Sequence, residues 1–263
     1  MPVRKRPSPL GLNATPKEII QAATAPLDDA SRRVFAKQLL SLGGLSLLTG
    51  VTLSHTGTVT PLLQAMSRFN DHAQAKLFDP TKLAPTYTLN DLTEPFPFNA
   101  YYGIEDVPVV DGSTYALEVS GLVRDRRAWR LSDLRALPQE SQITRHICVE
   151  GWSAIGQWGG VRFAHFLERI GADLTAKYVG FVCADDYYTS IDMPTALHPQ
   201  TLLALTTGPT LQPLPPADGY PLKLRIPTKL GFKNPKHIMA ITATNRYPGG
   251  YWEDQGYNWF SGS

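Results

Sequence analysis

The stretch Arg145-His146-Ile147-Cys148-Val149-Glu150-Gly151-Trp152-Ser153 carries one of the two cysteines of this 263-residue chain. Cys148 ends a β-branched run, residues 142–148, that predicts a strand, and the Gly-Trp-Ser sequence after it predicts a turn. Lone cysteines usually pack in a protein core. Other features of the sequence are therefore needed to tell whether this cysteine is a packing residue or has a chemical role.

Two chemical roles are open to Cys148 besides packing. It could be a nucleophile with His146 as its base, since residues two apart in a strand share a face, but no third residue that would orient the histidine is evident. Its thiolate could instead be a soft ligand to a metal that a cofactor also holds through sulfur. The other cysteine, Cys183, lies in a second strand-like run, so a disulfide between the two stays open.

Other familiar catalytic motifs are missing from the chain. It has no G-x-S-x-G elbow, P-loop, H-E-x-x-H or C-x-x-C sequence, which argues against hydrolase, NTPase, zinc-protease and thioredoxin-type chemistry. The Gly-rich run 156–160 contains the bulky Trp158, and we expect it to form a turn between a strand and a helix. A dinucleotide site there is disfavoured.

The composition predicts a globular protein without a general affinity for nucleic acid. Apolar residues make up 43% and aromatic residues 10% of the chain, more than a disordered chain carries, and the net charge is only +2. Residues 219–252 nevertheless contain no carboxylate but do contain six cationic side chains: Lys223, Arg225, Lys229, Lys233, Lys236 and Arg246. Charge alone leaves two interpretations open, a solvated basic face or a pocket for a phosphate-bearing anion.

The sequence of the N-terminal part predicts a targeting signal. Residues 1–30 are expected to form a flexible extension. Residues 31–56 begin with Ser31-Arg32-Arg33-Val34-Phe35 and continue with an uncharged, moderately apolar stretch, as in a twin-arginine signal. An amphipathic helix with a serine cap is the alternative. Because twin-arginine signals export folded proteins, this segment predicts a periplasmic protein with a cofactor inserted beforehand. No clear cleavage site follows, so an uncleaved signal could also anchor the chain to the membrane.

The body of the chain predicts an α+β fold with a mainly β core and short helices. An apolar periodicity favours helices at 61–78, 131–137 and 163–170. Alternation or β-branched runs favour strands at 115–119, 142–148, 177–183, 187–192, 222–226 and 237–242. The Pro-rich residues 79–99 are expected to be extended, and the aromatic tail 247–260 is expected to pack back on the domain.

With these features, residues 60–263 resemble the sulfite-oxidase-like molybdopterin-dependent oxidoreductase family and, within it, the periplasmic methionine-sulfoxide reductases. The resemblance is carried by six segments: residues 99–102 (NAYY), 148–153 (CVEGWS), 177–181 (KYVGF), 198–199 (HP), 219–227 (GYPLKLRIP) and 229–236 (KLGFKNPK). It implies a molybdopterin-binding catalytic domain of the sulfite-oxidase type. The dimerisation domain of the eukaryotic relatives is not expected here. We therefore expect a monomer.

The resemblance also implies roles for individual residues. Cys148 looks like the thiolate ligand of molybdenum in a molybdenum–molybdopterin cofactor. The other residues that match cofactor-binding positions are Asn99, Tyr101, Tyr102, Cys183, Asp218, Lys223, Lys233, Asn234, Pro235 and Lys236. The last four would meet the cofactor phosphate. Asp218 and Lys223 replace an Asn and an Arg, and Cys183 replaces a Thr, so these positions depart from the family pattern.

The function implied by the resemblance is oxygen-atom transfer, in the direction of S-oxide reduction. Electrons would come from a membrane haem-b or quinone-linked subunit, because the chain has no haem or flavin motif of its own. Sulfite oxidation at the same type of centre is one alternative. A cofactor-free exported binding module is the other.

Overall fold

The computed structural model describes residues 66, 69–71 and 73–262. Contacts divide the chain into Met1–Thr56 and Gly57–Ser263, and every described residue lies in the second unit. The predicted extension at 1–30 and export segment at 31–56 lie outside the described residues. Within the described residues, no helix combines the length and the apolar character needed to cross a membrane.

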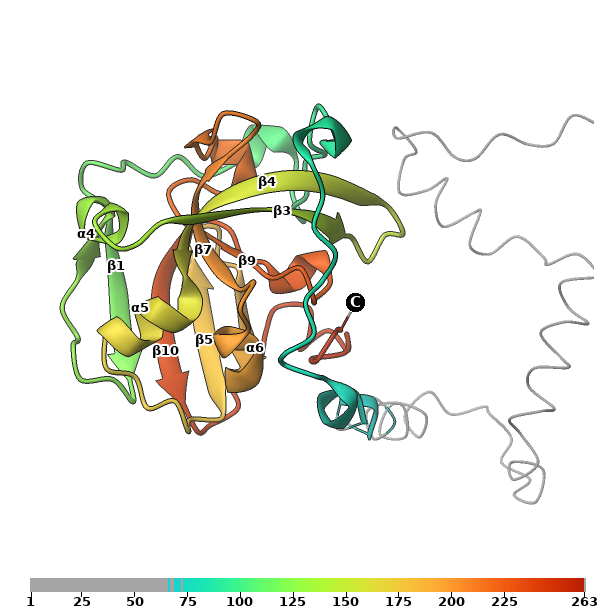
Figure 1. The fold of residues 1–263 in the computed structure, drawn as a ribbon. Helices are drawn as coiled ribbons and strands as arrows, with labels where there is room; N and C mark the ends of the chain where they lie inside the picture. The colour runs from blue at the N-terminus through green and yellow to red at the C-terminus, as the bar shows by residue number, and fades with distance from the viewer. Residues whose placement is uncertain (1–65, 67–68, 72, 263) are drawn as a thin grey trace, which may run out of the picture. The chain divides into compact units, whose positions relative to one another are not determined.

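Two five-stranded sheets form the framework (Figure 1). The first has the order β2 (Trp129–Arg130), β1 (Ala116–Gly121), β10 (Ile238–Thr244), β5 (Tyr178–Cys183) and β6 (Tyr188–Asp192), with only β1 and β10 parallel. The second has the order β3 (Glu140–Ile147), β4 (Ser153–Arg162), β7 (Leu202–Thr207) and β8 (Gln212–Pro213), and β9 (Lys223–Arg225) also pairs with β7.

The helices are short. The α-helices are α4 (Leu131–Arg135), α5 (Phe163–Arg169) and α6 (Met193–Leu197). Single 3-10 turns lie at η1 (Leu89–Asp91), η2 (Ile104–Asp106), η3 (Pro216–Asp218) and η4 (Gly231–Lys233). Residues 66, 69–71 and 73–77 are also helical. This is the α+β fold with a mainly β core that the sequence predicts.

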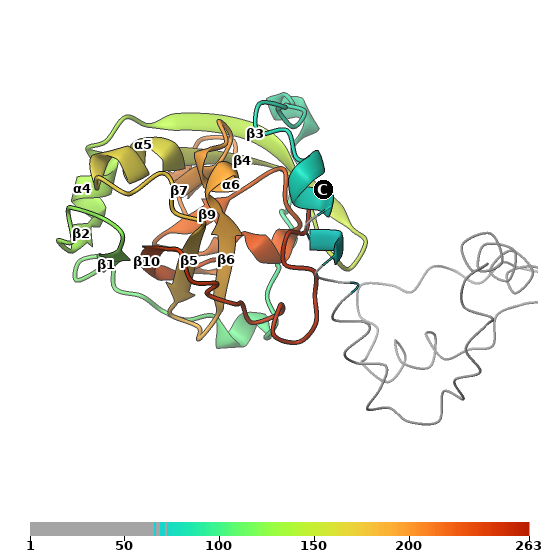
Figure 2. The same ribbon diagram turned by 90° about the horizontal axis from the view of Figure 1, so that it is seen from below.

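The core lies between α5 and the first sheet. Alternation places Val179 and Phe181 of β5 toward α5, where the Phe163 ring lies 5.7 Å from the ring of Phe181. Gly180, on the other face of β5, is close to Pro248 of the C-terminal tail. The helices and the tail therefore cover opposite faces of the sheet, as the view from below shows (Figure 2).

The predicted turn at 156–160 is wrong. These residues lie inside β4, which is ten residues long and pairs with both β3 and β7. The glycines serve close packing: a Cβ on Gly160 would stand 1.9 Å from the carbonyl oxygen of Leu203 in β7, and one on Gly156 would stand 2.9 Å from the Phe96 ring. Close approach of a neighbouring strand or ring, not reversal of the chain, is the reason for these glycines.

Other elements follow the predictions to within a few residues. The helix predicted at 131–137 ends at Arg135, and Asp133 accepts a hydrogen bond from the Arg130 amide at its start. The strand β7 and the helix α6 have no counterpart among the predictions. The tail does pack back on the domain, with Phe260 buried and its amide donating to Asp71 Oδ1 at 2.7 Å.

Candidate functional site

A cavity of about 260 Å³ opens beside Cys148. Five separate segments contribute to its wall. The lining residues are Phe98, Asn99, Ala100, Tyr101, Cys148, Val149, Glu150, Asp185, Tyr187, Gly231, Phe232, Asn234, Pro235, Lys236, Trp252 and Tyr257. Aromatic rings thus form much of the wall, and a thiol, a carboxylate and an amine share the same space.

A tight turn after β3 presents Cys148. The amide of Cys148 donates to the Trp152 carbonyl at 2.9 Å, and Gly151 adopts a φ of 93°, which a side chain would disfavour. Glu150 lies against the thiol: its Oε2 is 3.7 Å from Cys148 Sγ and accepts a hydrogen bond from Trp152 Nε1 at 2.9 Å. The turn therefore places a carboxylate next to the sulfur.

Asn99 contacts both His146 and Cys148 at the edge of the cavity. Asn99 Nδ2 lies 3.1 Å from His146 Nε2 and 3.6 Å from Cys148 Sγ, so its two amide protons can point at both. Only a glycine fits above them, since a Cβ on Gly231 would stand 2.6 Å from His146 Nε2. Burial, with a smaller contribution from the charge of Arg225, holds the pKa of His146 well below its usual range.

This geometry argues against a Cys148–His146 nucleophilic pair. The histidine faces Asn99, and burial followed by the nearby Glu150 raises the pKa of the Cys148 thiol. An activated nucleophilic cysteine has a lowered pKa instead. Both cysteines are free, so the disulfide left open by the sequence does not form.

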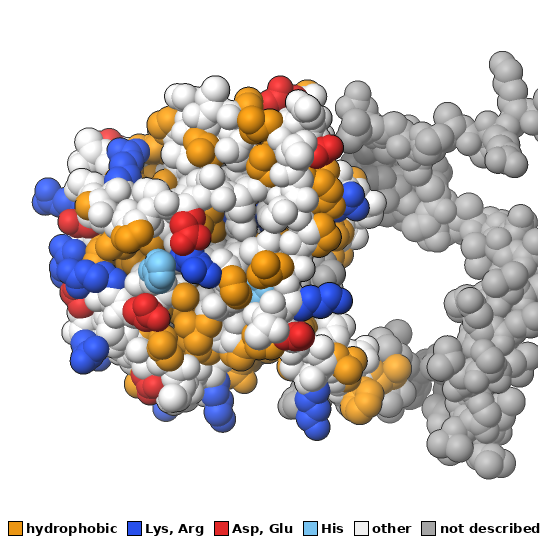
Figure 3. Space-filling model, viewed as in Figure 1, with side chains coloured by type: hydrophobic (Ala, Val, Ile, Leu, Met, Phe, Trp, Pro, Cys, Tyr) orange, Lys and Arg blue, Asp and Glu red, His pale blue; other side chains and the backbone are white. Residues whose placement is uncertain are grey.

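The basic tract is not a solvated face. Lys223, Arg225, Lys229, Lys233 and Lys236 are all buried, and Arg246 alone of the six cations is exposed. The basic side chains that reach the surface on the face drawn in Figure 3 lie mostly at the α4 end, interleaved with acidic ones. Burial is expensive for these cations: it lowers the pKa of Lys223 to about 7 and that of Lys236 to about 8.

Lys223 and Lys236 form no ion pair with a carboxylate of the described residues. Within the described residues, Lys223 Nζ makes no hydrogen bond or ion pair and lies over the Trp158 ring, 4.5 Å from its centroid. Lys236, at the cavity wall, donates to the Ala217 carbonyl at 2.9 Å. A buried ammonium without an anion is costly. The arrangement therefore fits an anionic ligand that carries several acceptor oxygens, as a pterin phosphate does.

The structure brings together six of the predicted site residues at the cavity wall: Asn99, Tyr101, Cys148, Asn234, Pro235 and Lys236. Tyr102 lies just behind the wall and donates to Asp185 Oδ2 at 2.8 Å. Cys183 is buried near the same carboxylate. Burial, followed by the charge of Asp185, raises the pKa of the Cys183 thiol. These positions remain predictions as cofactor contacts.

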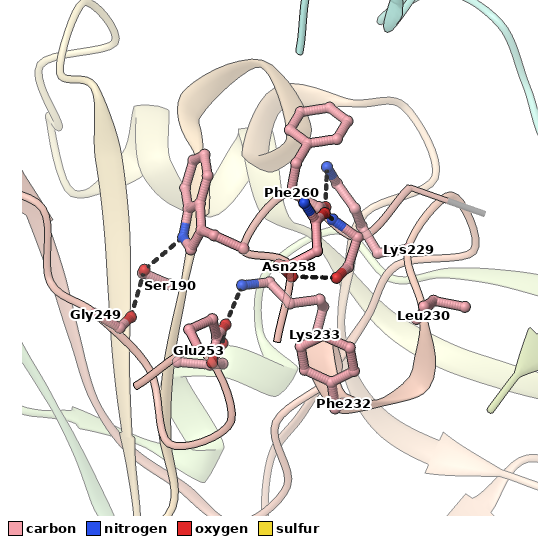
Figure 4. Close-up of polar contacts among 12 residues, drawn as sticks. Ser190, Lys229, Leu230, Phe232, Lys233, Gly249, Glu253, Asn258 and Phe260 are labelled. Carbon is pink, nitrogen blue, oxygen red and sulfur yellow. Dashed lines mark hydrogen bonds and ion pairs between the residues drawn. The ribbon is translucent and has the colours of Figure 1, made fainter. Parts of the chain in front are cut away.

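Three predicted residues lie away from the cavity wall. Asp218 lines a second cavity of about 550 Å³. Lys223 lies behind the wall, over Trp158. Lys233 forms a buried ion pair with Glu253 of the tail (Figure 4). Its ammonium group therefore already has a carboxylate partner.

Several wall residues could not be predicted from the sequence. Asp185 and Tyr187 belong to the β5–β6 hairpin, and Trp252 and Tyr257 belong to the tail, which the sequence suggested was structural. The tail reaches the site because Tyr101 stacks on Tyr251, with centroids 4.6 Å apart. No local signal could have placed these segments at one cavity, because residues 98–101, 185–187 and 252–257 are far apart in the sequence.

Comparisons with known proteins place the chain in a family. A family model described as oxidoreductase molybdopterin binding domain matches residues 104–252. A protein of Azospira oryzae, provisionally named protein-methionine-sulfoxide reductase subunit YedZ1, is 57% identical over 262 residues, which cover 100% of this chain and 99% of that protein.

More distant relatives match only part of the chain. The protein-methionine-sulfoxide reductase catalytic subunit MsrP of Xanthomonas campestris is 36% identical over 158 residues, 54% of this chain and 48% of that protein. The chain thus spans about half the length of this reductase. The crystal structure of the sulfane dehydrogenase SoxCD from Paracoccus pantotrophus has a TM-score of 0.49 and 18% identity over 53% of this chain and 40% of that one.

Proposed function

The chain belongs to the oxidoreductase molybdopterin-binding domain family, and we propose that it is a molybdenum enzyme that reduces an S-oxide with electrons from a membrane subunit. The observation that carries the proposal is the convergence of Cys148, Asn234 and Lys236 on one cavity. A thiolate donor and phosphate-binding groups at the same cavity are what a molybdenum–molybdopterin cofactor requires. The names of the relatives support the substrate class.

The residues at the cavity fit such a cofactor. Cys148 would ligate the metal, Asn99 and Tyr101 would contact the pterin, and Lys236 would neutralise its phosphate. When bound, this cofactor supplies two-electron oxygen-atom transfer, which no side chain of the chain can provide. Lys223, whose ammonium lies unpaired behind the cavity wall, would add positive potential.

The side chains around Cys148 handle substrate and protons. Phe98, Phe232 and Trp252 form an apolar wall that excludes water and can contact the alkyl groups of an S-oxide. Reduction of an S-oxide to a thioether and water consumes two protons. Glu150, which lines the cavity next to Cys148, is the carboxyl group placed to relay them.

Metal analysis and a single substitution test the proposal. The wild-type protein should contain about one molybdenum atom per chain and reduce a panel of S-oxides with a chemical electron donor. Cys148→Ser should lower that activity by at least about tenfold, because the metal loses its thiolate donor. Wild-type protein from cells grown with tungstate in place of molybdate is the control and should be inactive.

Two results would reject the proposal. Stoichiometric molybdenum with full activity in Cys148→Ser would remove the role given to this cysteine. Absence of molybdenum and pterin from the wild type would favour a cofactor-free binding module. Sulfite-dependent reduction of an electron acceptor, without S-oxide reduction, would show that the same centre works in the oxidising direction.

We also propose that the chain works in the periplasm, delivered there folded by its twin-arginine segment. The segment 31–56 and the need to insert a cofactor before export support this location. The chain would serve as a monomeric catalytic subunit that receives electrons from a membrane haem-b or quinone-linked partner. Whether the signal stays on the chain as an anchor can be read from the N-terminal sequence of the mature protein.

A further inference from the structure

Arg225 is a fully buried cation that touches two separate parts of the candidate site. It lies on β9, and its side chain has no exposed surface. Its Nη1 donates to Asn234 Oδ1 at 3.0 Å and to the Ile226 carbonyl at 3.1 Å. Its Nη2 donates to the Arg145 carbonyl at 2.5 Å and to Thr144 Oγ1 at 3.3 Å.

These bonds join β3, the strand that ends just before Cys148, to the cavity loop, residues 229–236. Thr144 and Arg145 belong to β3, which leads directly into the Cys148 turn. Asn234 lines the cavity; its Oδ1 also accepts the Ile226 amide at 2.6 Å and its Nδ2 donates to the Leu230 carbonyl. The guanidinium thus sets the spacing between the sulfur donor and the opposite wall. The planar guanidinium suits this task because its two terminal nitrogens donate hydrogen bonds to both segments at once.

The charge of Arg225 is not balanced by its partners. All four acceptors are neutral, and no ion pair includes Arg225 within the described residues. Its Nε is buried without a hydrogen-bond partner there. Burial lowers the pKa of Arg225 to about 9, and no carboxylate opposes that shift. The group therefore remains a cation at neutral pH in a region that also contains Lys223 and Lys236.

A neutral amide could make some of these hydrogen bonds, so the retained charge points to an anion that belongs nearby. We propose that Arg225 is a positioning residue for the metal ligand and that its charge raises the reduction potential of the bound cofactor. This inference rests on the proposed function. A fixed positive charge stabilises the form of the centre that carries more electrons, and it does so most where water is excluded.

Redox titration of the molybdenum-loaded enzyme tests this role. The paramagnetic molybdenum signal gives the midpoint potential of the wild type, Arg225→Lys and Arg225→Met. Arg225→Met should lower the midpoint potential by about 59 mV, which corresponds to a tenfold change in the one-electron equilibrium constant. Arg225→Lys keeps the charge and should stay near the wild-type potential. Arg145→Met is the matched control, because that side chain is exposed and solvent screens its charge.

The outcomes separate the inference from the proposed function. Equal potentials in the wild type and Arg225→Met, with one molybdenum atom per chain in each, would overturn the inference and leave the proposed function intact. Absence of molybdenum from the wild type would reject the proposed function itself. If Arg225→Met does not fold, Thr144→Asp places a carboxylate beside the guanidinium. It should lower the potential in the same direction, and an unchanged potential would overturn the inference.

Discussion

Lys223 shows how single residues prepare the site for an anion. Its ammonium is buried, lies over Trp158 and makes no hydrogen bond or ion pair within the described part of the chain. Burial, followed by the charge of Lys236, lowers its pKa to about 7, and Asp218 only partly opposes this. An isolated buried charge costs stability. The same residue would gain an interaction when a phosphate-bearing cofactor binds.

Lys223→Met should therefore stabilise the cofactor-free protein at pH 7, by about 1–4 kcal/mol in the free energy of unfolding. The pKa of Lys223 is about 7 in the fold and higher in the unfolded chain, so between these values the unfolded chain binds more protons. Wild-type stability then rises with pH through this residue. The gap between variant and wild type should be largest at pH 7 and below and should narrow toward pH 10 in urea unfolding.

Lys177→Met is the matched control for this prediction. Lys177 is exposed, and removing it should leave the free energy of unfolding nearly unchanged at both pH values. A Lys223→Met protein that is less stable than the wild type at pH 7 would contradict the interpretation, because it would mean that the ammonium already has a stabilising partner.

At the scale of elements, the C-terminal tail is part of the site. Lys229 Nζ donates to the Phe260 carbonyl at 2.7 Å, and Trp259 Nε1 donates to Ser190 Oγ, which donates in turn to the Gly249 carbonyl (Figure 4). The Lys233–Glu253 ion pair joins the cavity loop to the same tail, with both side chains 1% exposed. These bonds hold Trp252 and Tyr257 at the cavity wall.

Glu253→Gln should release this tail. The substitution leaves Lys233 buried without a counterion, and breaking a buried pair in this way costs about 3–5 kcal/mol. The melting temperature should fall, and hydrogen exchange should speed up most at the amides of residues 249–257. Replacing the exposed Glu168 by Gln is the control. Unchanged exchange in the tail of Glu253→Gln would show that the aromatic contacts alone hold it in place.

At the scale of the whole molecule, the chain combines a proposed export segment with a domain whose described residues include buried cations without a counterion, such as Lys223 and Arg225. Such a domain reaches full stability only with its anionic cofactor. Insertion of the cofactor before export is consistent with this requirement. The twin arginines then matter for location and not for catalysis.

Replacement of Arg32 and Arg33 by Lys should keep the protein in the cytoplasm. The loaded enzyme should accumulate there with unchanged molybdenum content and unchanged S-oxide reduction by a chemical donor, because the segment lies outside the catalytic domain. Cell fractionation followed by immunoblotting measures the distribution. Periplasmic accumulation of the doubly substituted protein would contradict the proposed route.

Several features could be predicted from local sequence because their physical causes are local. Alternation in 115–119 and the stripe Phe163, Phe166, Leu167 report which face is buried, and both elements form as predicted. The turn after Cys148 needs a glycine at 151 and has one. The 229–236 segment brings Asn234 and Lys236 to the cavity because they lie close together in one loop.

Other features depend on neighbours that sequence order does not reveal. The close packing around the glycines of β4 involves the Leu203 backbone and the Thr206 side chain of β7 and the ring of Phe96. Lys233, to which the family resemblance gave a phosphate contact, is paired by a glutamate 20 residues later. The sequence also left open whether the basic tract forms a solvated surface or a pocket, and the burial of its side chains decides for a pocket. Sequence by itself determined the chemistry available, namely one motif cysteine and a carboxylate-free basic tract, and it predicted an export address. Tertiary structure alone decided which of these groups meet, because packing brings together segments that no local pattern connects.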